Sequence, residues 1–306
     1  MPHRLAATLL VLCTALAVAA PASALTIGIA DQKPDMFTDP RFEDSGIRFV
    51  RRAVAWDTLT SPTQTAVLDQ WLNAARAAHV DPLISFTQSS ADHRELPSPE
   101  RLLYEFRRFR ARYPWVTDFA SWNEANHCGQ PTCHRPKLVA AYWRKLRMAC
   151  PKCRILAAEV LDMPNMISWV KAFRRASKVQ PRYWGLHNYV DANRLRTSGT
   201  RRLLKATGHA LIWFTETGGI VSRTNRRKVT FPESASHAAI ATRFVFDKLV
   251  PLSRRITRVY LYHWNSEPGP KTWDSGLIGP TGKPRPAFRV LERELAKLAR
   301  RRVGAG

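Results

Sequence analysis

Residues 211–219 read Leu-Ile-Trp-Phe-Thr-Glu-Thr-Gly-Gly. The first five side chains are apolar, aromatic or β-branched, as in a buried strand, and the glycine pair marks the end of that strand. Glu216 directly follows this run, where an ionised carboxylate is costly to bury unless it serves a purpose. Residues 117–124 repeat the arrangement, because a run that closes on Trp122 is followed by Asn123 and Glu124. The chain therefore predicts two buried strands that each end in a glutamate.

Short β-rich runs alternate with helical patterns along the chain from residue 25, without a linker or low-complexity segment. The expected strands span residues 26–30, 47–55, 82–87, 117–122, 154–159, 183–187, 211–215 and 258–264. The expected helices span residues 64–78, 99–112, 134–148, 165–176, 193–206, 234–249 and 286–300, and residues 31–45 are expected to form a loop or a single turn. Eight strands with crossover helices favour a parallel sheet, and eight is the number that closes a barrel. The sequence predicts an α/β fold, a single (β/α)8 TIM barrel formed by residues 25–306.

A doubly wound open sheet is the alternative fold, but no glycine-rich phosphate loop follows the first strand. In a barrel, functional side chains lie where the strands end and the following loops begin. The residues at these strand ends are Arg51, Arg52, Trp56, Gln88, Asn123, Glu124, Glu159, Asp162, His187, Tyr189, Glu216 and Trp264.

The two glutamates that close strands four and seven form the constellation most suited to catalysis. Cleavage of a glycosidic bond needs one carboxylic acid to protonate the leaving oxygen and one carboxylate to attack or to activate water. The surroundings must therefore separate the pKa values of the two groups. Glu124 and Glu216 meet the first requirement, and Arg51 offers a cation that would keep a neighbouring glutamate ionised.

These motifs resemble those of the clan of retaining barrel glycosidases whose acid/base and nucleophile follow strands four and seven. The clan's Trp/Phe-Asn-Glu motif is matched at residues 122–124, and its Thr/Ser-Glu-x-Gly motif at residues 215–218. Residues 46–51 are similar to its second strand, and residues 276–288 to the segment before its last helix. Among clan members, β-xylosidase-like and iduronidase-like enzymes look most similar. Ala125 stands where the clan often has proline, which weakens the match only slightly.

The resemblance implies a role for each matched residue. Glu124 would be the general acid/base and Glu216 the nucleophile. Asn123 would bind the sugar 2-hydroxyl, and Arg51, or Arg52 if the register is shifted by one residue, would keep Glu216 ionised. The resemblance further implies positions for four other side chains: His187 near Glu216 or the sugar, Trp264 as an apolar platform under the sugar, and Tyr189 and Trp56 in the cleft wall.

Residues 1–24 have the three parts of a secretory signal. His3 and Arg4 form a short polar start, residues 5–20 are apolar, and Ala22-Ser23-Ala24 offers small residues for cleavage. We expect a mature chain that begins at Leu25 and is secreted or extracytoplasmic. A retained membrane anchor is the alternative, but the run is short for a membrane span and no later stretch is apolar enough for one.

Four cysteines follow the signal, at positions 128, 133, 150 and 153. The helical pattern at residues 134–148 would hold the two pairs roughly 20 Å apart, whereas a disulfide needs Cα atoms within about 7 Å. The spacing therefore predicts the disulfides Cys128–Cys133 and Cys150–Cys153, as an exported chain would form. The same distance argues against a zinc site built from all four cysteines.

The formal net charge of +24 favours anionic partners such as acidic or cell-wall polysaccharide, lipid or nucleic acid. A simple surface preference for arginine would also explain this charge, and no recognisable nucleic-acid-binding module accompanies it. We expect a carbohydrate substrate, for which an acidic or cell-wall polysaccharide is one candidate, and no nucleic acid. The loop at residues 218–231 should border the cleft beside Glu216, and it carries the cations Arg223, Arg226, Arg227 and Lys228.

Three other interpretations compete with an exported retaining glycoside hydrolase. A catalytically silent carbohydrate-binding protein is the first, although both glutamates are present. A basic cell-envelope or nucleic-acid-binding protein that uses the barrel only as a platform is the second. A metalloenzyme is the third, but the histidines show no His-x-His or His-Glu-x-x-His spacing. No metal and no cofactor are therefore expected.

Overall fold

Nine strands form one sheet in the computed structural model, which describes residues 25–224, 230–269 and 273–303. Neighbouring strands run parallel throughout. Their bounds are β1 Thr26–Ala30, β2 Phe49–Ala55, β3 Asp81–Thr87, β4 Asp118–Ala120, β5 Arg154–Leu156, β6 Glu159–Leu161, β7 Tyr183–His187, β8 Leu211–Thr217 and β10 Ile256–Tyr262. The predicted signal, residues 1–24, lies outside the described residues.

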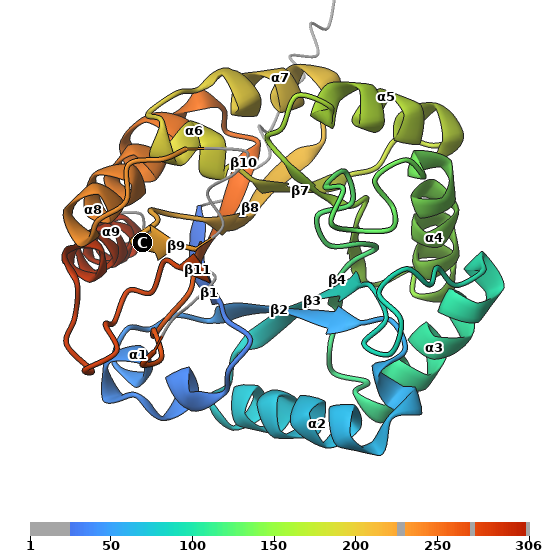
Figure 1. Cartoon of the computed structure of the whole chain (residues 1–306), viewed down its shortest axis with the longest axis horizontal. Helices are drawn as coiled ribbons and strands as arrows, with labels where there is room; N and C mark the ends of the chain where they lie inside the picture. The colour runs from blue at the N-terminus through green and yellow to red at the C-terminus, as the bar shows by residue number, and fades with distance from the viewer. Residues whose placement is uncertain (1–24, 225–229, 270–272, 304–306) are drawn as a thin grey trace, which may run out of the picture.

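The sheet closes into a barrel because β5 and β6 are two pieces of one extended segment. The sheet order is β5-β4-β3-β2-β1-β10-β8-β7-β6, so these two pieces stand at its two ends. The segment bonds to both neighbours: Ser121 donates to the carbonyl of Leu156, and Gly185 donates to that of Ala158. The nine strands thus occupy eight positions, and the predicted (β/α)8 barrel is confirmed. Figure 1 looks along the barrel, with the helices in a ring outside the strands.

The outer helices are α2 Pro62–Ala77, α3 Pro99–Arg112, α4 Pro136–Ala149, α5 Met166–Ala176, α7 Ser198–Ala206, α8 Ala235–Phe244 and α9 Pro286–Val303. Serines begin three of them, because the hydroxyls of Ser61, Ser98 and Ser234 accept the backbone N–H three residues on. Proline occupies the first helical position of α2 and α3, where its missing N–H costs nothing. No helix in the described ranges is long and apolar enough to cross a membrane.

Several short helices and strands supplement the eight-stranded barrel and its outer helices. Residues 31–45 contain a 3-10 turn, Asp35–Thr38, and the one-turn helix α1 Pro40–Glu43, as expected for that segment. Another short helix, α6 Tyr189–Asn193, follows β7, and the strands β9 Ser222–Arg223 and β11 Trp273–Asp274 pair antiparallel. A helix was predicted over residues 193–206, but α7 begins only at Ser198. The Asp191 carboxylate accepts the N–H groups of Gly199 and Thr200 and so fixes the later start.

The barrel interior has an apolar layer in its middle and a charged layer at the end where the strands begin. The apolar layer consists of Ala30, Leu83, Ala120, Leu156, Trp213 and Tyr260. Below it, Asp118 is buried and binds two cations, with 2.6 Å to Arg154 Nε and 2.8 Å to Arg258 Nη1. Any chemistry at the other end of the strands is therefore separated from this charged group by packed side chains.

Candidate active site

Five ionisable side chains converge inside the barrel near the carboxyl ends of the strands. They are Arg51 in β2, Glu124 after β4, Glu159 in β6, His187 in β7 and Glu216 in β8. The parallel registers bring them together, since Gly185 pairs with Glu159 and His187 pairs with Glu216. The structure therefore brings together both predicted glutamates, the predicted arginine and the predicted histidine.

Arg51 is the fixed cation of this cluster and has no exposed surface. Its Nη1 donates to Glu216 Oε1 at 2.5 Å, its Nη2 donates to Asn123 Oδ1 at 2.6 Å, and its Nε donates to Glu159 Oε1 at 2.8 Å. Arg52 instead points outward, where it lies over the Trp71 ring and donates to the carbonyl of Val67. Arg51, and not the alternative Arg52, therefore contacts the predicted nucleophile.

Glu124 stands on a turn that leaves β4 with its backbone in the left-handed region, at a φ of 47°. Such a conformation is unfavourable for residues other than glycine, so contacts of the neighbouring backbone must stabilise it. Asn123 donates its N–H to the carbonyl of Phe86, and Ala125 donates to that of Glu159. These two bonds, to the neighbouring strands β3 and β6, fix where the Glu124 carboxylate lies.

His187 is buried between the carboxylates. Its Nδ1 lies 3.2 Å from Glu124 Oε1 and 3.7 Å from Glu216 Oε2, and its Nε2 lies 3.6 Å from Glu159 Oε2. Burial alone would lower the pKa of His187, but the surrounding negative charges raise it to about 9. The proton on His187 in turn lowers the pKa of Glu124, against the opposing effect of burial. The two pKa shifts favour one shared proton for the pair, held on His187 with its Nδ1 3.2 Å from Glu124 Oε1.

The two predicted catalytic glutamates lie close together. One oxygen of Glu124, one oxygen of Glu216 and one nitrogen of His187 all lie within 4.8 Å of one another. Three such atoms form a possible set of metal ligands, but the surrounding carboxylates raise the pKa of His187 to about 9, which favours its protonated form, and Arg51 already binds Glu216. We therefore assign no metal to this cluster, because its cations are side chains.

Glu159 was noted only as a strand end, and its place in the site was missed. Its carboxylate is fully buried and accepts from Arg51 Nε, Arg51 Nη2 and the Ser85 hydroxyl. Burial alone would raise the pKa of Glu159, but the Arg51 charge lowers it to about 2. The only hint in the sequence was a carboxylate after an apolar run, the same hint that indicated Glu124 and Glu216.

The prediction that Trp264 forms a sugar platform is wrong. Its ring has no exposed surface, packs edge-on against Phe42 and Phe288, and donates to Asp39 Oδ2 at 2.9 Å. A buried ring offers no face to a ligand. Trp56, predicted in the cleft wall, is likewise buried, with 4% of its surface exposed, and it belongs to the core under the helices.

Tyr189 and Tyr262 are the tyrosines that border the glutamates. The Tyr189 hydroxyl donates to Glu216 Oε2 at 3.3 Å, and its ring contacts Trp273 edge-on at 4.8 Å. Tyr262 ends β10, and burial together with the charge of Glu216 raises the pKa of its hydroxyl. Tyr262 was missed because the last strand was expected to end two residues later, at Trp264.

A cross-linked loop follows Glu124. Cys128 and Cys133 are disulfide-bonded with Cα atoms 4.8 Å apart, and Cys150 and Cys153 with Cα atoms 5.3 Å apart, so both predicted pairs are confirmed. Asn126 anchors the start of the loop, because its side chain both donates to and accepts from the backbone of Leu161. The loop therefore presents a fixed rim beside Glu124.

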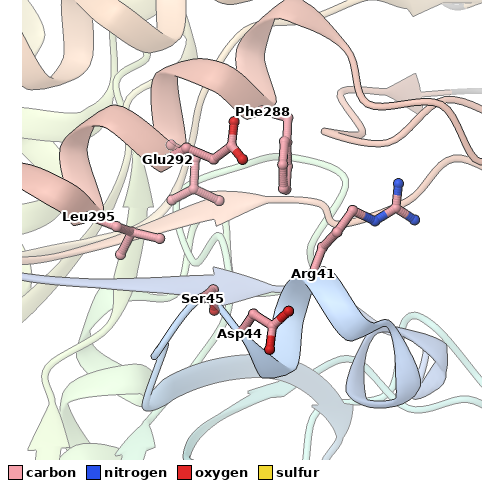
Figure 2. A pocket seen from close by; sticks show the side chains of 7 residues that line it. Arg41, Asp44, Ser45, Phe288, Glu292 and Leu295 are labelled. Carbon is pink, nitrogen blue, oxygen red and sulfur yellow. The ribbon is translucent and has the colours of Figure 1, made fainter.

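The basic loop predicted beside Glu216 is described only in part. Arg223 donates from its backbone and its Nε to the Glu233 carboxylate, which neutralises its charge. Arg226, Arg227 and Lys228 lie outside the described residues. A separate hollow of about 310 Å3 lies between α1 and α9. Arg41 and Asp44 border one side of this hollow, and Phe288 and Glu292 border the other (Figure 2).

Comparison with known proteins defines the fold. No protein-family model and no curated protein sequence matches the chain. Among solved structures it resembles a GH39 β-xylosidase from Caulobacter crescentus, with 17% identity, a TM-score of 0.64, and coverage of 89% of this chain and 71% of that chain. It also resembles fungal β-1,4-galactanases, with 14% identity, a TM-score of 0.64, and coverage of 88% and 99%.

A third similar structure is an endo-β-1,3-glucanase of GH128 from Amycolatopsis mediterranei in complex with laminarihexaose. It shares 16% identity and a TM-score of 0.58, with 88% of this chain and 99% of that chain covered. At such identities the likeness establishes the barrel fold of this chain. The names of all three structures are those of glycoside-cleaving enzymes.

Proposed function

We propose that this protein is an exported retaining glycoside hydrolase that cleaves O-glycosidic bonds, with Glu216 as nucleophile and Glu124 as general acid/base. The observation that carries the proposal is the pair of carboxylate oxygens within 4.8 Å of each other. Carboxyl groups about 5 Å apart suit direct attack on the anomeric carbon, whereas inverting enzymes need about 6.5 to 9.5 Å to admit a water.

In the first step Glu216 attacks the anomeric carbon while the bond to the leaving oxygen breaks. The proton shared by Glu124 and His187 moves through Glu124 to that oxygen. In the second step the pair takes a proton from water, whose oxygen bonds to the anomeric carbon as the bond to Glu216 breaks. Asn123 suits the sugar 2-hydroxyl, because Arg51 occupies its carbonyl oxygen and leaves its amide N–H groups to donate.

The cluster keeps its charge through the first step. In the free site, the carboxylates of Glu124, Glu159 and Glu216 face protonated Arg51 and His187, so the sum is −1. After the step one proton has left, but Glu216 has become a neutral ester, and the sum is again −1. The buried surroundings therefore need little electrostatic rearrangement, which favours the reaction in a site of low dielectric.

The test is product stereochemistry on a panel of oligosaccharides, followed by 1H NMR of the anomeric protons at early times. Retention is expected, together with covalent labelling of Glu216 by a 2-deoxy-2-fluoro glycoside of the cleaved sugar. Inverted product would overturn the assignment. Binding to glycans with no turnover, and no labelling, would instead identify a catalytically silent binding protein.

Export rests on the signal-like residues 1–24 and is supported by the two disulfides, which form in oxidising compartments. Expression of the full chain with its own N-terminus should give extracytoplasmic protein that begins at Leu25. N-terminal sequencing of that material decides the matter, and retention of His3 would contradict cleavage.

An acidic or cell-wall glycan is the substrate class that the net charge of +24 favours. Because Arg223 is already neutralised by Glu233, the proposal depends on Arg226 and Arg227. Changing both to Gln should raise KM for acidic glycans more than for neutral ones, and salt should reduce the difference. Equal effects on both glycan types at low salt would remove the proposal.

A further inference from the structure

Glu159 lies beneath the two glutamates and touches both cations of the cluster. Its Oε1 accepts from Arg51 Nε at 2.8 Å, and its Oε2 accepts from Arg51 Nη2 at 2.5 Å. The same Oε2 lies 3.6 Å from His187 Nε2. A buried carboxylate is costly unless it is fully paired. Glu159 meets this condition, since Ser85 also donates to it at 2.8 Å.

The barrel makes space for this carboxylate at Gly185. A Cβ at position 185 would lie 2.6 Å from Glu159 Cγ and 2.8 Å from Thr215 Oγ1. Neither distance is compatible with a side chain, so glycine at this point of β7 is what allows Glu159 to reach the barrel axis. The glycine in β7 and the glutamate in the neighbouring strand β6 therefore depend on each other sterically.

We propose that Glu159 is a positioning residue that aims Arg51 at Glu216 and keeps His187 protonated beside Glu124. The inference rests on the proposed function for its catalytic consequence, but its electrostatic part concerns the folded protein alone. Glu159 binds Nε and Nη2 of Arg51 and so fixes the plane of the guanidinium group. The remaining nitrogen, Nη1, is thereby directed at Glu216, and Nη2 also donates to Asn123.

The charges around His187 allow the sign of the effect to be worked out. Glu124 and Glu216 face its Nδ1, Glu159 faces its Nε2, and Arg51 is the other cation of the cluster. The nearby hydroxyls of Tyr189 and Tyr262 stay neutral, because burial raises the pKa of both. Replacing Glu159 by a neutral group removes a negative charge, and so lowers the pKa of the proton that His187 and Glu124 share.

Glu159→Gln is the decisive variant, because the glutamine is nearly the same size. The alkaline limb of the kcat/KM profile should move to lower pH by about one unit or more. At the optimum, kcat should fall about 100-fold with KM much less affected, because Arg51 no longer holds its direction. A merely structural loss would lower activity at every pH without moving the limb.

Asp118→Asn is the matched control. Asp118 is also a buried carboxylate bound to arginines inside the barrel, but it lies at the opposite end of the strands. This variant should lose stability and leave the alkaline limb where it is. Ser85→Ala, which removes a hydrogen bond to Glu159 but no charge, should also leave the limb in place.

A titration that needs no substrate separates the two proposals. The His187 ring signals, identified by their loss in His187→Gln, are followed by 1H–15N NMR against pH. Wild-type protein should hold the His187 proton to about pH 9, and Glu159→Gln should lose it about one unit or more earlier. If no glycan is cleaved, the proposed function fails and this titration still decides the role of Glu159.

Two results would overturn the inference. One is a wild-type His187 pKa at or below the ordinary 6.5, which can be measured even if the variant does not fold. The other is an active enzyme whose Glu159→Gln form keeps both the alkaline limb and the His187 titration of the wild type.

Discussion

The hydroxyl of Tyr189 donates to Glu216 Oε2 at 3.3 Å, while Arg51 donates to the other oxygen of the same carboxylate at 2.5 Å. Both oxygens of the nucleophile are therefore held before substrate binds. Tyr189 itself is held by α6, whose first N–H groups bind the buried Asp162 carboxylate. Burial raises the pKa of Asp162 to about 7, although those N–H groups oppose the shift.

Tyr189→Phe should lower kcat about tenfold, because it removes one neutral hydrogen bond from the nucleophile. The fold should be unaffected, since the ring keeps its contact with Trp273. Steady-state kinetics on the cleaved glycan measure the effect. Tyr104→Phe, at an exposed site on α3, is the control and should match the wild type. Equal rates for both variants would show that the hydrogen bond has no catalytic part.

The two glutamates should fail differently when they are removed. Glu216→Ala should lose nearly all turnover, and azide should restore part of it with an inverted product, because a small anion fits the space of the carboxylate. Glu124→Ala should keep most activity on substrates with good leaving groups, which need little proton donation. Rates across a series of aryl glycosides measure the difference. Identical dependence on leaving group would contradict the assigned roles.

His187 also predicts how stability depends on pH. Its pKa is raised in the folded protein from 6.5 to about 9, so its contribution is complete below pH 6.5 and is lost as the pH rises through 9. A shift of this size is worth roughly 3 kcal/mol. Urea unfolding at pH 6 and pH 9.5 should show a loss that is smaller in His187→Gln. An equal loss of stability in both proteins would show that groups other than His187 cause the pH dependence.

The Cys128–Cys133 disulfide should matter to both stability and rate. Opening such a short loop by changing both cysteines to serine should lower the free energy of unfolding by about 2 kcal/mol and raise KM, because the rim beside Glu124 is no longer fixed. The matched control is the same change at Cys150 and Cys153, which follow α4. It should destabilise the protein similarly and leave KM unchanged, as thermal unfolding and kinetics would show.

The strand pattern was predictable where it depends on short-range signals. β1 and β7 begin and end at the expected residues, because each contains a short run without polar side chains or with tyrosine only, at residues 27–30 and 183–186, that a polar residue follows. Glu124 and Glu216 were found for a similar reason, since Glu216 directly follows an apolar or β-branched run and Glu124 is separated from one by Asn123 alone. These features require only local hydrophobicity and the order of strands along the chain.

The sequence predictions failed at a strand end and where two interacting residues lie far apart in the sequence. Tyr260, Tyr262 and Trp264 alternate along the chain, so all three would share one face of a strand that continued to residue 264. β10 ends at Tyr262, and the backbone then turns Trp264 towards Phe42 and Phe288. Glu159 was missed because its partner Arg51 is 108 positions away, and no local pattern records that pairing.

The close approach of Gly185 to Glu159 also means that substitutions at the two positions are linked in evolution. Any side chain gained at position 185 would collide with the carboxylate stem, 2.6 Å away, so such a change is tolerated only after the glutamate has been lost. Among descendants of a common ancestor, the two positions are therefore expected to change in a fixed order. A homologue with glycine at 185 and no glutamate at 159 would be an intermediate on that route.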